Sequence, residues 1–301
     1  MSKTSLKDRV AVITGAGGGL GRAYALELAK LGARVLVNDV EESAEDSSPA
    51  PAQKVVEEIK EAGGEAEANY DSVAEWESAK SIISSAVESF GKIDILVNNA
   101  GILRDKSLMK MEVEDFLSVI KVHLEGTFYC TKAAMPYMRE QGYGRIVSAS
   151  SAAGLYGNFG QSNYAAAKMG IVGLMNCVKE EGANYGILAN TVVPTAGTRM
   201  TATIMPADVV EKLKPEHVAP LVAYLCSDDC TVNGRVFTAG GGYFSRAAVM
   251  EGPGHYFNPD REINADMIAD HLDYIDNLQG GRGFNNAGEQ TAQVLSRLMK
   301  E

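Results

Sequence analysis

Cysteines are few in this chain, and no metal-ligand pattern is present. There are 4 cysteines in 301 residues, at positions 130, 177, 226 and 230, too few and too scattered for a disulfide framework. Cys226 and Cys230 lie close together, but they lack the second pair or the histidines that a zinc site needs. The 4 histidines show no metal-ligand spacing. The sequence therefore predicts free thiols and no metal site.

Long apolar runs and basic clusters are also missing. No stretch approaches the ~18 apolar residues of a membrane-spanning helix, and the start, MSKTSLKDR, contains no signal-peptide core. With Lys+Arg 28 against Asp+Glu 39, the net charge of −11 disfavours nucleic acids and anionic membranes as partners. The last residues, RLMKE, contain no peroxisomal address. We therefore expect a cytoplasmic protein with no nucleic-acid or membrane partner.

Short apolar segments alternate with helical patterns along most of the chain. Hydrophobic residues make up 46% of the sequence, enough for a sizeable core. Strands rich in Val and Ile that alternate with helices are typical of a parallel sheet covered on both faces. We predict an α/β fold with a doubly wound, Rossmann-like parallel sheet of seven strands and helices on both faces. The predicted strands are 10–14, 34–39, 66–71, 93–98, 145–150, 187–193 and 235–238, and the predicted helices include 23–31, 55–62, 76–90, 116–138 and 165–185.

Two segments interrupt this alternation. Residues 41–52, EESAEDSSPAPA, are acidic and rich in Ser and Pro, which indicates an insertion after the second strand. Beyond Gly242 the alternation stops, and apolar residues recur at helical spacing between Ile263 and Ile275 and again near the end. We therefore predict a Rossmann-type domain at 1–242. The extension 243–301, mainly loop and helix, is expected to pack on a partner subunit or to close over a substrate.

A glycine-rich segment, TGAGGGLG, directly follows the first predicted strand and opens a helix. Gly15, Gly19 and Gly21 permit a tight turn, a close approach of the backbone to a pyrophosphate and close packing of helix on strand. Together with Leu20 they would hold a dinucleotide at the helix N-terminus, where free N–H groups favour an anion. A purely structural turn is the alternative, because a glycine-rich run alone is weak support.

Asp39 ends the second predicted strand, close to the ~20-residue spacing after the glycines at which a carboxylate accepts hydrogen bonds from the adenosine ribose. A carboxylate there repels a 2′-phosphate, and neither Gly18 nor Val40 supplies the cation that such a phosphate needs. The predicted cofactor is therefore NAD rather than NADP. The alternative is a solvated acid at the end of a strand.

Ser151, Tyr164 and Lys168 form a candidate catalytic group. Tyr164 and Lys168 are one helical turn apart, so their side chains share a face. The ammonium is expected to lower the pKa of the tyrosine from ~10 toward the range of a general base. Ser151 would donate a hydrogen bond to the substrate oxygen. An isolated Tyr–Lys pair is often a surface feature, but the preceding serine and the dinucleotide loop favour catalysis.

These motifs, with NNAG at 98–101 and YAAAK at 164–168, resemble the short-chain dehydrogenase/reductase superfamily over roughly residues 6–242. The resemblance implies that Ser151, Tyr164 and Lys168 are catalytic and that the domain 1–242 binds NAD. It also implies further cofactor contacts, with the adenine at Asp71, Ser72 and Val73, along the cofactor at Asn98 and Ala100, and near the nicotinamide carboxamide at Thr198.

Longer strings, including NNAGILRDKS and YGNFGQSNYAAAK, are similar to one branch, the (3R)-hydroxyacyl-CoA dehydrogenase domains of the peroxisomal multifunctional enzymes type 2, also called 17β-hydroxysteroid dehydrogenases type 4. This implies NAD-dependent interconversion of a (3R)-hydroxyacyl-CoA and its 3-ketoacyl-CoA in a homodimer, and a homotetramer stays open as the alternative assembly. His123 stands where most of the superfamily has an Asn that holds a water joined to the lysine. Either its imidazole takes over that hydrogen bond, or it is a buried helix histidine satisfied by backbone.

The substrate is less well defined by the sequence. Met200, Ile204 and Met205 stand where a lid over an acyl group is expected, although Met also packs in cores. Arg104 and Lys106 are the candidate local cations for an anionic acyl-CoA. Two alternatives remain: a dehydrogenase of hydroxysteroids or other free secondary alcohols, and an idle dinucleotide-binding sensor or scaffold. The sensor is disfavoured because it would not need the three catalytic side chains.

Overall fold

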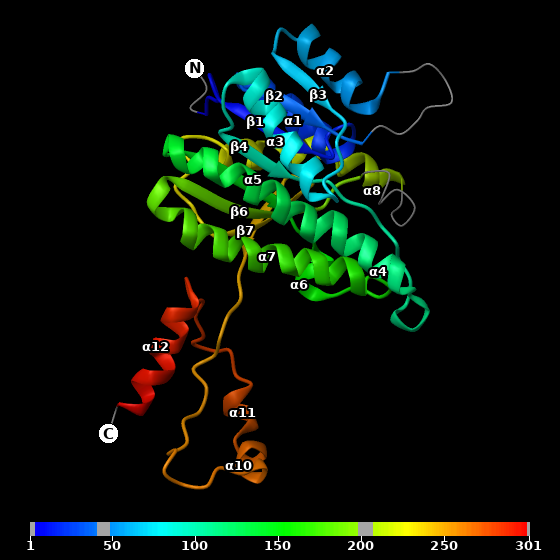
Figure 1. Ribbon diagram of the computed structural model, residues 1–301. Coiled ribbons are helices and arrows are strands. Elements are labelled where there is room, and N and C mark those ends of the chain that lie inside the picture. The colour runs from blue at the N-terminus through cyan, green and yellow to red at the C-terminus, as the bar shows by residue number, and fades with distance from the viewer. Residues whose placement is uncertain (1–3, 41–48, 198–206, 300–301) are drawn as a thin grey trace. The chain divides into compact units, whose positions relative to one another are not determined.

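The computed structural model describes residues 4–40, 49–197 and 207–299 (Figure 1). The chain divides into two compact units, Met1–Arg246 and Ala247–Glu301. The first unit contains the sheet, whose strand order is β3-β2-β1-β4-β5-β6-β7-β8. The strands are β1 (Val10–Thr14), β2 (Arg34–Asn38), β3 (Ala66–Asn69), β4 (Ile95–Asn98), β5 (Gly144–Ala149), β6 (Ile187–Pro194), β7 (Val236–Gly240) and β8 (Tyr243–Ala247).

The helices of the first unit connect these strands. They are α1 (Gly19–Lys30), α2 (Pro51–Glu61), α3 (Trp76–Phe90), α4 (Val113–Ile120), α5 (Gly126–Gln141), α6 (Ala152–Tyr156), α7 (Ser162–Gly182), α8 (Ala207–Lys212) and α9 (Ala219–Leu225), with short 3₁₀ turns η1 (Leu108–Lys110), η3 (Ala183–Tyr185) and η4 (Pro215–His217) and a π-helical turn η2 (Lys121–Glu125).

Strands β1 to β7 pair in parallel, and the order of the strands reverses between β1 and β4. In a doubly wound sheet the helices that follow these two strands leave in opposite directions. The carboxyl ends of β1 and β4 therefore border a crevice in which ligands bind. The prediction of a Rossmann-like α/β sheet with helices on both faces is confirmed.

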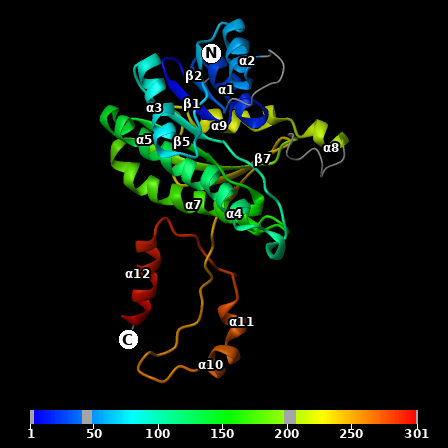
Figure 2. The ribbon, with the colours of Figure 1, turned by 45° about the vertical axis from the view of Figure 1, so that its right-hand side comes forward.

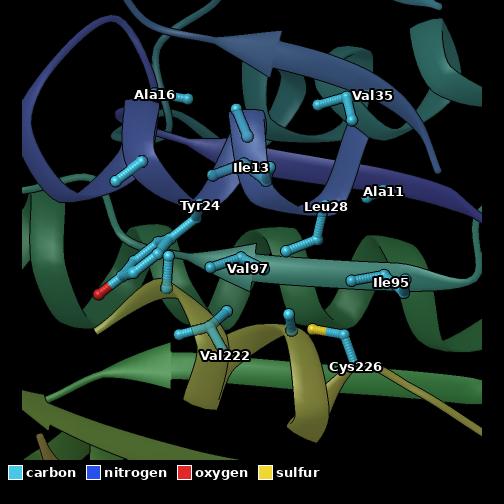
Figure 3. Packing of buried hydrophobic residues seen from close by; sticks show 14 of the residues in the cluster. Ala11, Ile13, Ala16, Tyr24, Leu28, Val35, Ile95, Val97, Val222 and Cys226 are labelled. Atoms are coloured by element: carbon cyan, nitrogen blue, oxygen red, sulfur yellow. The ribbon is translucent and has the colours of Figure 1, made fainter. Parts of the chain in front are cut away.

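The two faces of the sheet bury alternate residues, as the two-residue period of a strand requires. Ala11 and Ile13 of β1 belong to a core shared with α1, α2 and α9, whereas Val10 and Val12 belong to a core shared with α3, α5 and α7. Figure 2 shows α9 beside α1. In Figure 3, Tyr24 and Leu28 of α1 pack over β1 and β4 beside residues of α9. This packing holds both crevice-forming strands rigidly.

The prediction of seven strands was wrong, because the sheet contains an eighth strand, β8. Gly241 and Gly242 form the two-residue connection between β7 and β8, with φ of 56° and 83°. Two successive positive φ angles are typical of a type I′ hairpin turn, and so short a connection joins antiparallel strands. The alternation was predicted to end at Gly242, but Gly241 and Gly242 together are also a strong hairpin signal.

The predicted bounds of the insertion and of one long helix also differ from the structure. The helix α2 begins at Pro51, so the insertion predicted at 41–52 ends earlier than expected. Proline suits the first helical position because the backbone N–H that it lacks would have no partner within the helix. Residues 41–48 lie outside the described part. The single helix predicted at 116–138 is α4 and α5 with the π-helical turn 121–125 between them. Such turns inside helices are frequently found at functional sites.

The second unit contains α10 (Ala265–Asp270), α11 (Leu272–Ile275) and α12 (Ala287–Leu298). The single amphipathic helix expected across 263–275 is therefore two short helices, separated at His271. None of the described residues of this unit is buried, and Leu272, Leu278 and Val294 are at least half exposed. Across the described ranges of both units, no helix has the length and apolarity to cross a membrane.

Candidate active site

A cavity of about 620 Å³ lies at the carboxyl ends of the central strands of the first unit. The residues predicted from sequence that line it are Gly15, Gly19, Leu20, Asp39, Asp71, Ser72, Val73, Ala100, Tyr164 and Lys168. The lining also includes residues to which the sequence assigned no role: Asn38, Asn99, Ile102, Leu103, Val122, Ala149 and Ser150. Several of these end a strand or directly follow one. The rule that parallel strands carry ligands at their carboxyl ends is a signal by which they could have been found.

The glycine loop has the features that a dinucleotide requires. Gly18 is the N-cap of α1, no side chain caps the free N–H groups, and the first turn contains no acidic residue. A phosphate at this end of the helix would therefore meet donors and the positive end of the dipole without competition. Gly15 has a φ of 64°, and a Cβ there would lie 2.7 Å from the Cα of Ala100. The residues present thus fit a bound pyrophosphate.

Asp39 is joined to the glycine loop. Its Oδ2 accepts a hydrogen bond of 2.8 Å from the N–H of Gly17. A Cβ on Gly17 would lie 2.8 Å from that same oxygen and 2.6 Å from the Cβ of Pro51. Asp39 therefore orders the loop in addition to presenting a carboxylate to the cavity.

Asn38 holds the backbone of the second acid of the cavity lining, Asp71. Its Nδ2 donates to Oδ1 of Asn69 and to the backbone oxygen of Asp71, each at 2.8 Å. The Nδ2 of Asn69 in turn donates to Oδ2 of Asp71 at 3.0 Å. This end of the cavity therefore has two carboxylates, that of Asp39 held by the backbone N–H of Gly17 and that of Asp71 held by a buried asparagine.

The two asparagines at the end of β4, Asn98 within it and Asn99 directly after it, have different positions. Asn99 lines the cavity, and its Nδ2 donates to the backbone oxygens of Thr14 and Gly15 at 3.1 and 3.0 Å. Asn98, expected along the cofactor, does not line the cavity. Its buried Nδ2 instead donates to Thr131 and Ser148 at 3.1 and 3.2 Å. Asn98 thus braces the sheet, because its side chain points toward α5 and β5.

Gly21 likewise lies behind the cavity lining. A Cβ on Gly21 would lie 2.2 Å from the backbone oxygen of Gly15, so only glycine permits this packing of α1 against the loop. Thr198 and the predicted lid residues Met200, Ile204 and Met205 lie outside the described residues.

Ser151 and Tyr164 are joined by a hydrogen bond. Ser151 is the N-cap of α6, and its Oγ accepts from the N–H of Ala153 at 3.2 Å. The pKa of Tyr164 is raised from its ordinary value, chiefly because burial disfavours the phenolate. The hydrogen bond from Ser151 lowers this pKa, and the charge of Asp105 raises it. In the protein chain alone the pKa of Tyr164 is therefore raised and not lowered as expected, because desolvation is the largest effect on it.

Lys168 is buried, and its Nζ donates to the backbone oxygen of Ala149 at 2.7 Å. The same nitrogen lies 5.5 Å from the centroid of the Tyr164 ring. Burial lowers the pKa of Lys168 to about 7. Around it, Ser150 Oγ donates to the backbone oxygen of Lys168 at 2.7 Å, and a Cβ on Gly154 would lie 2.8 Å from its Cβ. These contacts fix α7 against β5 and leave the lysine little freedom.

His123 lies in the π-helical turn beside Tyr164, their rings edge to face with centroids 5.1 Å apart. Its Nε2 is 3.0 Å from the N atom and 2.8 Å from the O atom of Ile102, while its buried Nδ1 has no partner among the described residues. Burial, and then the charge of Lys168, lower the pKa of His123 to about 3. The imidazole is therefore neutral and bonded to backbone. The contact with Ile102 matches the interpretation of His123 as a buried histidine satisfied by backbone. Its Nδ1, which has no partner among the described residues, is compatible with the other interpretation, a hydrogen bond to a water joined to Lys168.

This arrangement of sheet, glycine loop and Ser–Tyr–Lys group corresponds to a known class of oxidoreductase. The family profile described as "short chain dehydrogenase" matches residues 9–209. The chain belongs to the short-chain dehydrogenases, enzymes that act on CH–OH groups with a nicotinamide cofactor.

The chain is similar to several individual proteins. It is 45% identical over 296 residues to peroxisomal multifunctional enzyme A of Dictyostelium discoideum, covering 98% of this chain and 66% of that protein. It is 44% identical to a hydroxyacyl-CoA dehydrogenase of Mycobacterium tuberculosis, covering 78% of each. The full-length peroxisomal multifunctional enzyme type 2 of Drosophila melanogaster has a matching structure, with a TM-score of 0.84, 41% identity, and coverage of 98% of this chain and 50% of that one. The chain thus spans 66% and 50% of the length of these two multifunctional proteins.

Proposed function

We propose that the protein is an NAD-dependent (3R)-hydroxyacyl-CoA dehydrogenase, which interconverts the hydroxyacyl-CoA and its 3-ketoacyl-CoA. The observation that carries the proposal is the position of Tyr164 and Lys168 in the same cavity as the glycine loop, so that a reacting alcohol and a dinucleotide would meet there. The similarity to a protein named hydroxyacyl-CoA dehydrogenase supports the thioester substrate. Fatty-acyl and steroid side-chain thioesters both fit the substrate class.

The preference for NAD rests on Asp39. Its carboxylate lines the cavity, and the adjacent loop residues Gly17 and Gly18 have no side chain to bind a 2′-phosphate. The cost of placing a phosphate beside a carboxylate supports NAD over NADP.

The proposed chemistry assigns one task to each side chain. When bound, NAD accepts the hydride from the substrate carbon. Ser151 donates a hydrogen bond to the substrate oxygen, and the oxygen of Tyr164 takes the hydroxyl proton. The ammonium form of Lys168 stabilises the phenolate form of Tyr164 that accepts this proton and becomes a neutral phenol, and Lys168 would also bind the cofactor ribose. Because the pKa of Tyr164 is raised in the chain alone, the positive charge of the oxidised nicotinamide is needed to bring it into the working range.

The test is NADH formation from (3R)-hydroxyacyl-CoA, its 3S epimer and a free sterol. We expect turnover of the 3R thioester only. Turnover of the sterol alone would support the alternative, a free-alcohol dehydrogenase, and NAD binding without any turnover would support the idle sensor. Faster turnover with NADP than with NAD would contradict the role of Asp39.

Assembly, domain division and location complete the proposal. We propose a homodimer or homotetramer in which residues 1–242 are the catalytic domain and 243–301 an extension that covers apolar side chains by contact with a partner subunit. Location in the cytoplasm is also proposed. Light scattering of the full chain tests the assembly, and imaging of the tagged full chain tests the location. A signal in peroxisomes would contradict the location in the cytoplasm.

A further inference from the structure

The two ends of the cavity carry charges of opposite sign. Asp39 and Asp71 line the end beside the glycine loop, where the adenosine of a dinucleotide is expected. Tyr164, Lys168 and Arg104 also line the cavity, and they come after β4 and β5, which lie on the other side of β1 from β2 and β3. Lys168 is buried and already donates to Ala149, whereas Arg104 is exposed. An anionic group of a substrate is therefore attracted to the end that contains Arg104.

The structure distinguishes the two cations that the sequence suggested for this region. The Nζ of Lys106 is 2.8 Å from Oδ2 of Asp115, and this hydrogen bond raises the pKa of Lys106. Lys106 also does not line the cavity. The guanidinium of Arg104 donates only to the backbone oxygen of Leu103, at 3.1 Å, and no carboxylate of the described residues pairs with it. Arg104 is the one whose charge is available to a ligand.

The backbone of Arg104 is fixed to the helix that carries the catalytic tyrosine. Asn163, fully buried, donates from Nδ2 to the backbone oxygens of Arg104 at 3.0 Å and Asp115 at 3.2 Å, and its Oδ1 accepts from the N–H of Tyr164 at 2.7 Å. Gln161 donates to Asp105 at 2.8 Å, and the N–H of Lys106 donates to Gly160 at 2.9 Å. The position of Arg104 relative to Tyr164 is therefore held by hydrogen bonds from several residues at the start of α7.

We infer that Arg104 is a substrate-binding residue that recognises a phosphate of coenzyme A when the hydroxyl group of the acyl chain is at Tyr164. The inference rests on the proposed function and adds a residue that selects CoA thioesters over uncharged ones. A guanidinium binds phosphate through paired, charge-assisted hydrogen bonds, which an ammonium reproduces only in part. Asn163 acts as a positioning residue through the backbone of Arg104.

The test compares two thioesters of the same (3R)-hydroxyacyl group, one on coenzyme A and one on N-acetylcysteamine, which has no phosphate. The readout is the ratio of kcat/KM for the two substrates. Arg104→Ala should lower this ratio about tenfold, the size expected for loss of a charge-assisted hydrogen bond, and Arg104→Lys should restore part of it. Lys110→Ala is the matched control, because it removes one positive charge from an exposed neighbour that does not line the cavity.

The possible results separate this inference from the proposed function. If the wild-type protein turns over neither thioester, the proposed function fails. If it turns over both and Arg104→Ala leaves the ratio as it is in the wild-type protein, the function stands and the inference is overturned. An equal fall in the ratio for Lys110→Ala would also overturn it, because the effect would then be one of overall charge. A dependence on Arg104 that appears only with free hydroxy acids would assign the residue to a carboxylate instead.

Discussion

The ammonium nitrogen of Lys168 lies 5.5 Å from the ring centroid of Tyr164, one helical turn earlier in α7. Both side chains are withdrawn from water, and burial opposes charge on each of them. The protein chain alone therefore keeps the tyrosine protonated and brings the lysine near its neutral form at pH 7. The charges of a bound cofactor and substrate are needed to change this balance.

Tyr164→Phe tests the general base. The variant removes the hydroxyl and keeps the ring that packs against His123. We expect kcat to fall by about 10²–10⁴-fold, the usual contribution of a positioned acid or base, while NAD binding measured by calorimetry is retained. Turnover within a few-fold of the wild-type rate would contradict the assigned role.

Lys168→Met tests the effect of burial on the lysine. The pKa of Lys168 is about 7 in the folded protein, against ~10.4 in the unfolded chain. Between these values the unfolded chain binds a proton that the folded protein does not, so the free energy of unfolding rises with pH in that window. Relative to Lys168→Met, we expect the wild-type protein to gain stability above pH 7, by at most about 1.4 kcal/mol per pH unit. Denaturant unfolding at pH 7, 8 and 9 measures the free energy of unfolding of both proteins. The same change with pH in the wild-type protein and in Lys168→Met would contradict the prediction.

Asp39 is tested by a pair of substitutions that separate charge from hydrogen bonding. Asp39→Asn removes the charge and retains an acceptor for the N–H of Gly17, whereas Asp39→Ala removes both. We expect both variants to use NADP better, and Asp39→Ala alone to lose about tenfold or more in NAD affinity because the glycine loop loses its anchor. KM values for NAD and NADP provide the measurement. Equal NAD affinities in the two variants would show that the contact with Gly17 does not order the loop.

His123→Ala tests a buried imidazole that contacts backbone. We expect a loss of roughly 2–4 kcal/mol of stability, because the substitution leaves a cavity and unpaired groups of Ile102. With a folded pKa of about 3 and an unfolded one of ~6.5, the stability contributed by the neutral form is present above ~6.5 and is lost as pH falls toward 3. Imidazole NMR should show no titration of His123 between pH 5 and 8.

Gly101→Ala provides a second variant for the same contact. Its Cβ would lie 2.2 Å from Cε1 of His123, so the ring must move. We expect this variant to be less stable than the wild-type protein and the double variant with His123→Ala to recover part of the loss. Strict additivity of the two losses would show that the glycine does not make room for the histidine.

Truncation after Ala247 tests the second unit. Its described residues contain no buried side chain, so its apolar groups need a partner to cover them. We expect the shortened chain, which keeps β8, to form an assembly with fewer subunits, counted as the mass from light scattering divided by the mass of one shortened chain, and to retain NAD binding. An unchanged number of subunits with unchanged kinetics would mean that this unit contributes to neither.

The sequence by itself determined the features that depend on local order and spacing. The alternation of strands and helices, the turn at Gly15 and the one-turn separation of Tyr164 and Lys168 all follow from residues close together in the chain. The bounds of β1 agree with the prediction because its apolar run begins directly after Arg9 and ends at Thr14, just before the glycine loop. The eighth strand could also have been predicted, since Gly241 and Gly242 carry a local hairpin signal.

The tertiary structure decided what depends on residues distant in sequence. Only the fold turns the side chain of Asn98 away from the cavity and joins Asp39 to Gly17. The fold also raises the pKa of Tyr164, where the sequence predicted a lowering, because burial is a property of the assembled core. The charge of Arg104 is available, and that of Lys106 is not, because Asp115 of α4 folds back beside the lysine. Desolvation and pairing are set by packed neighbours, and the order of residues along the chain does not specify them.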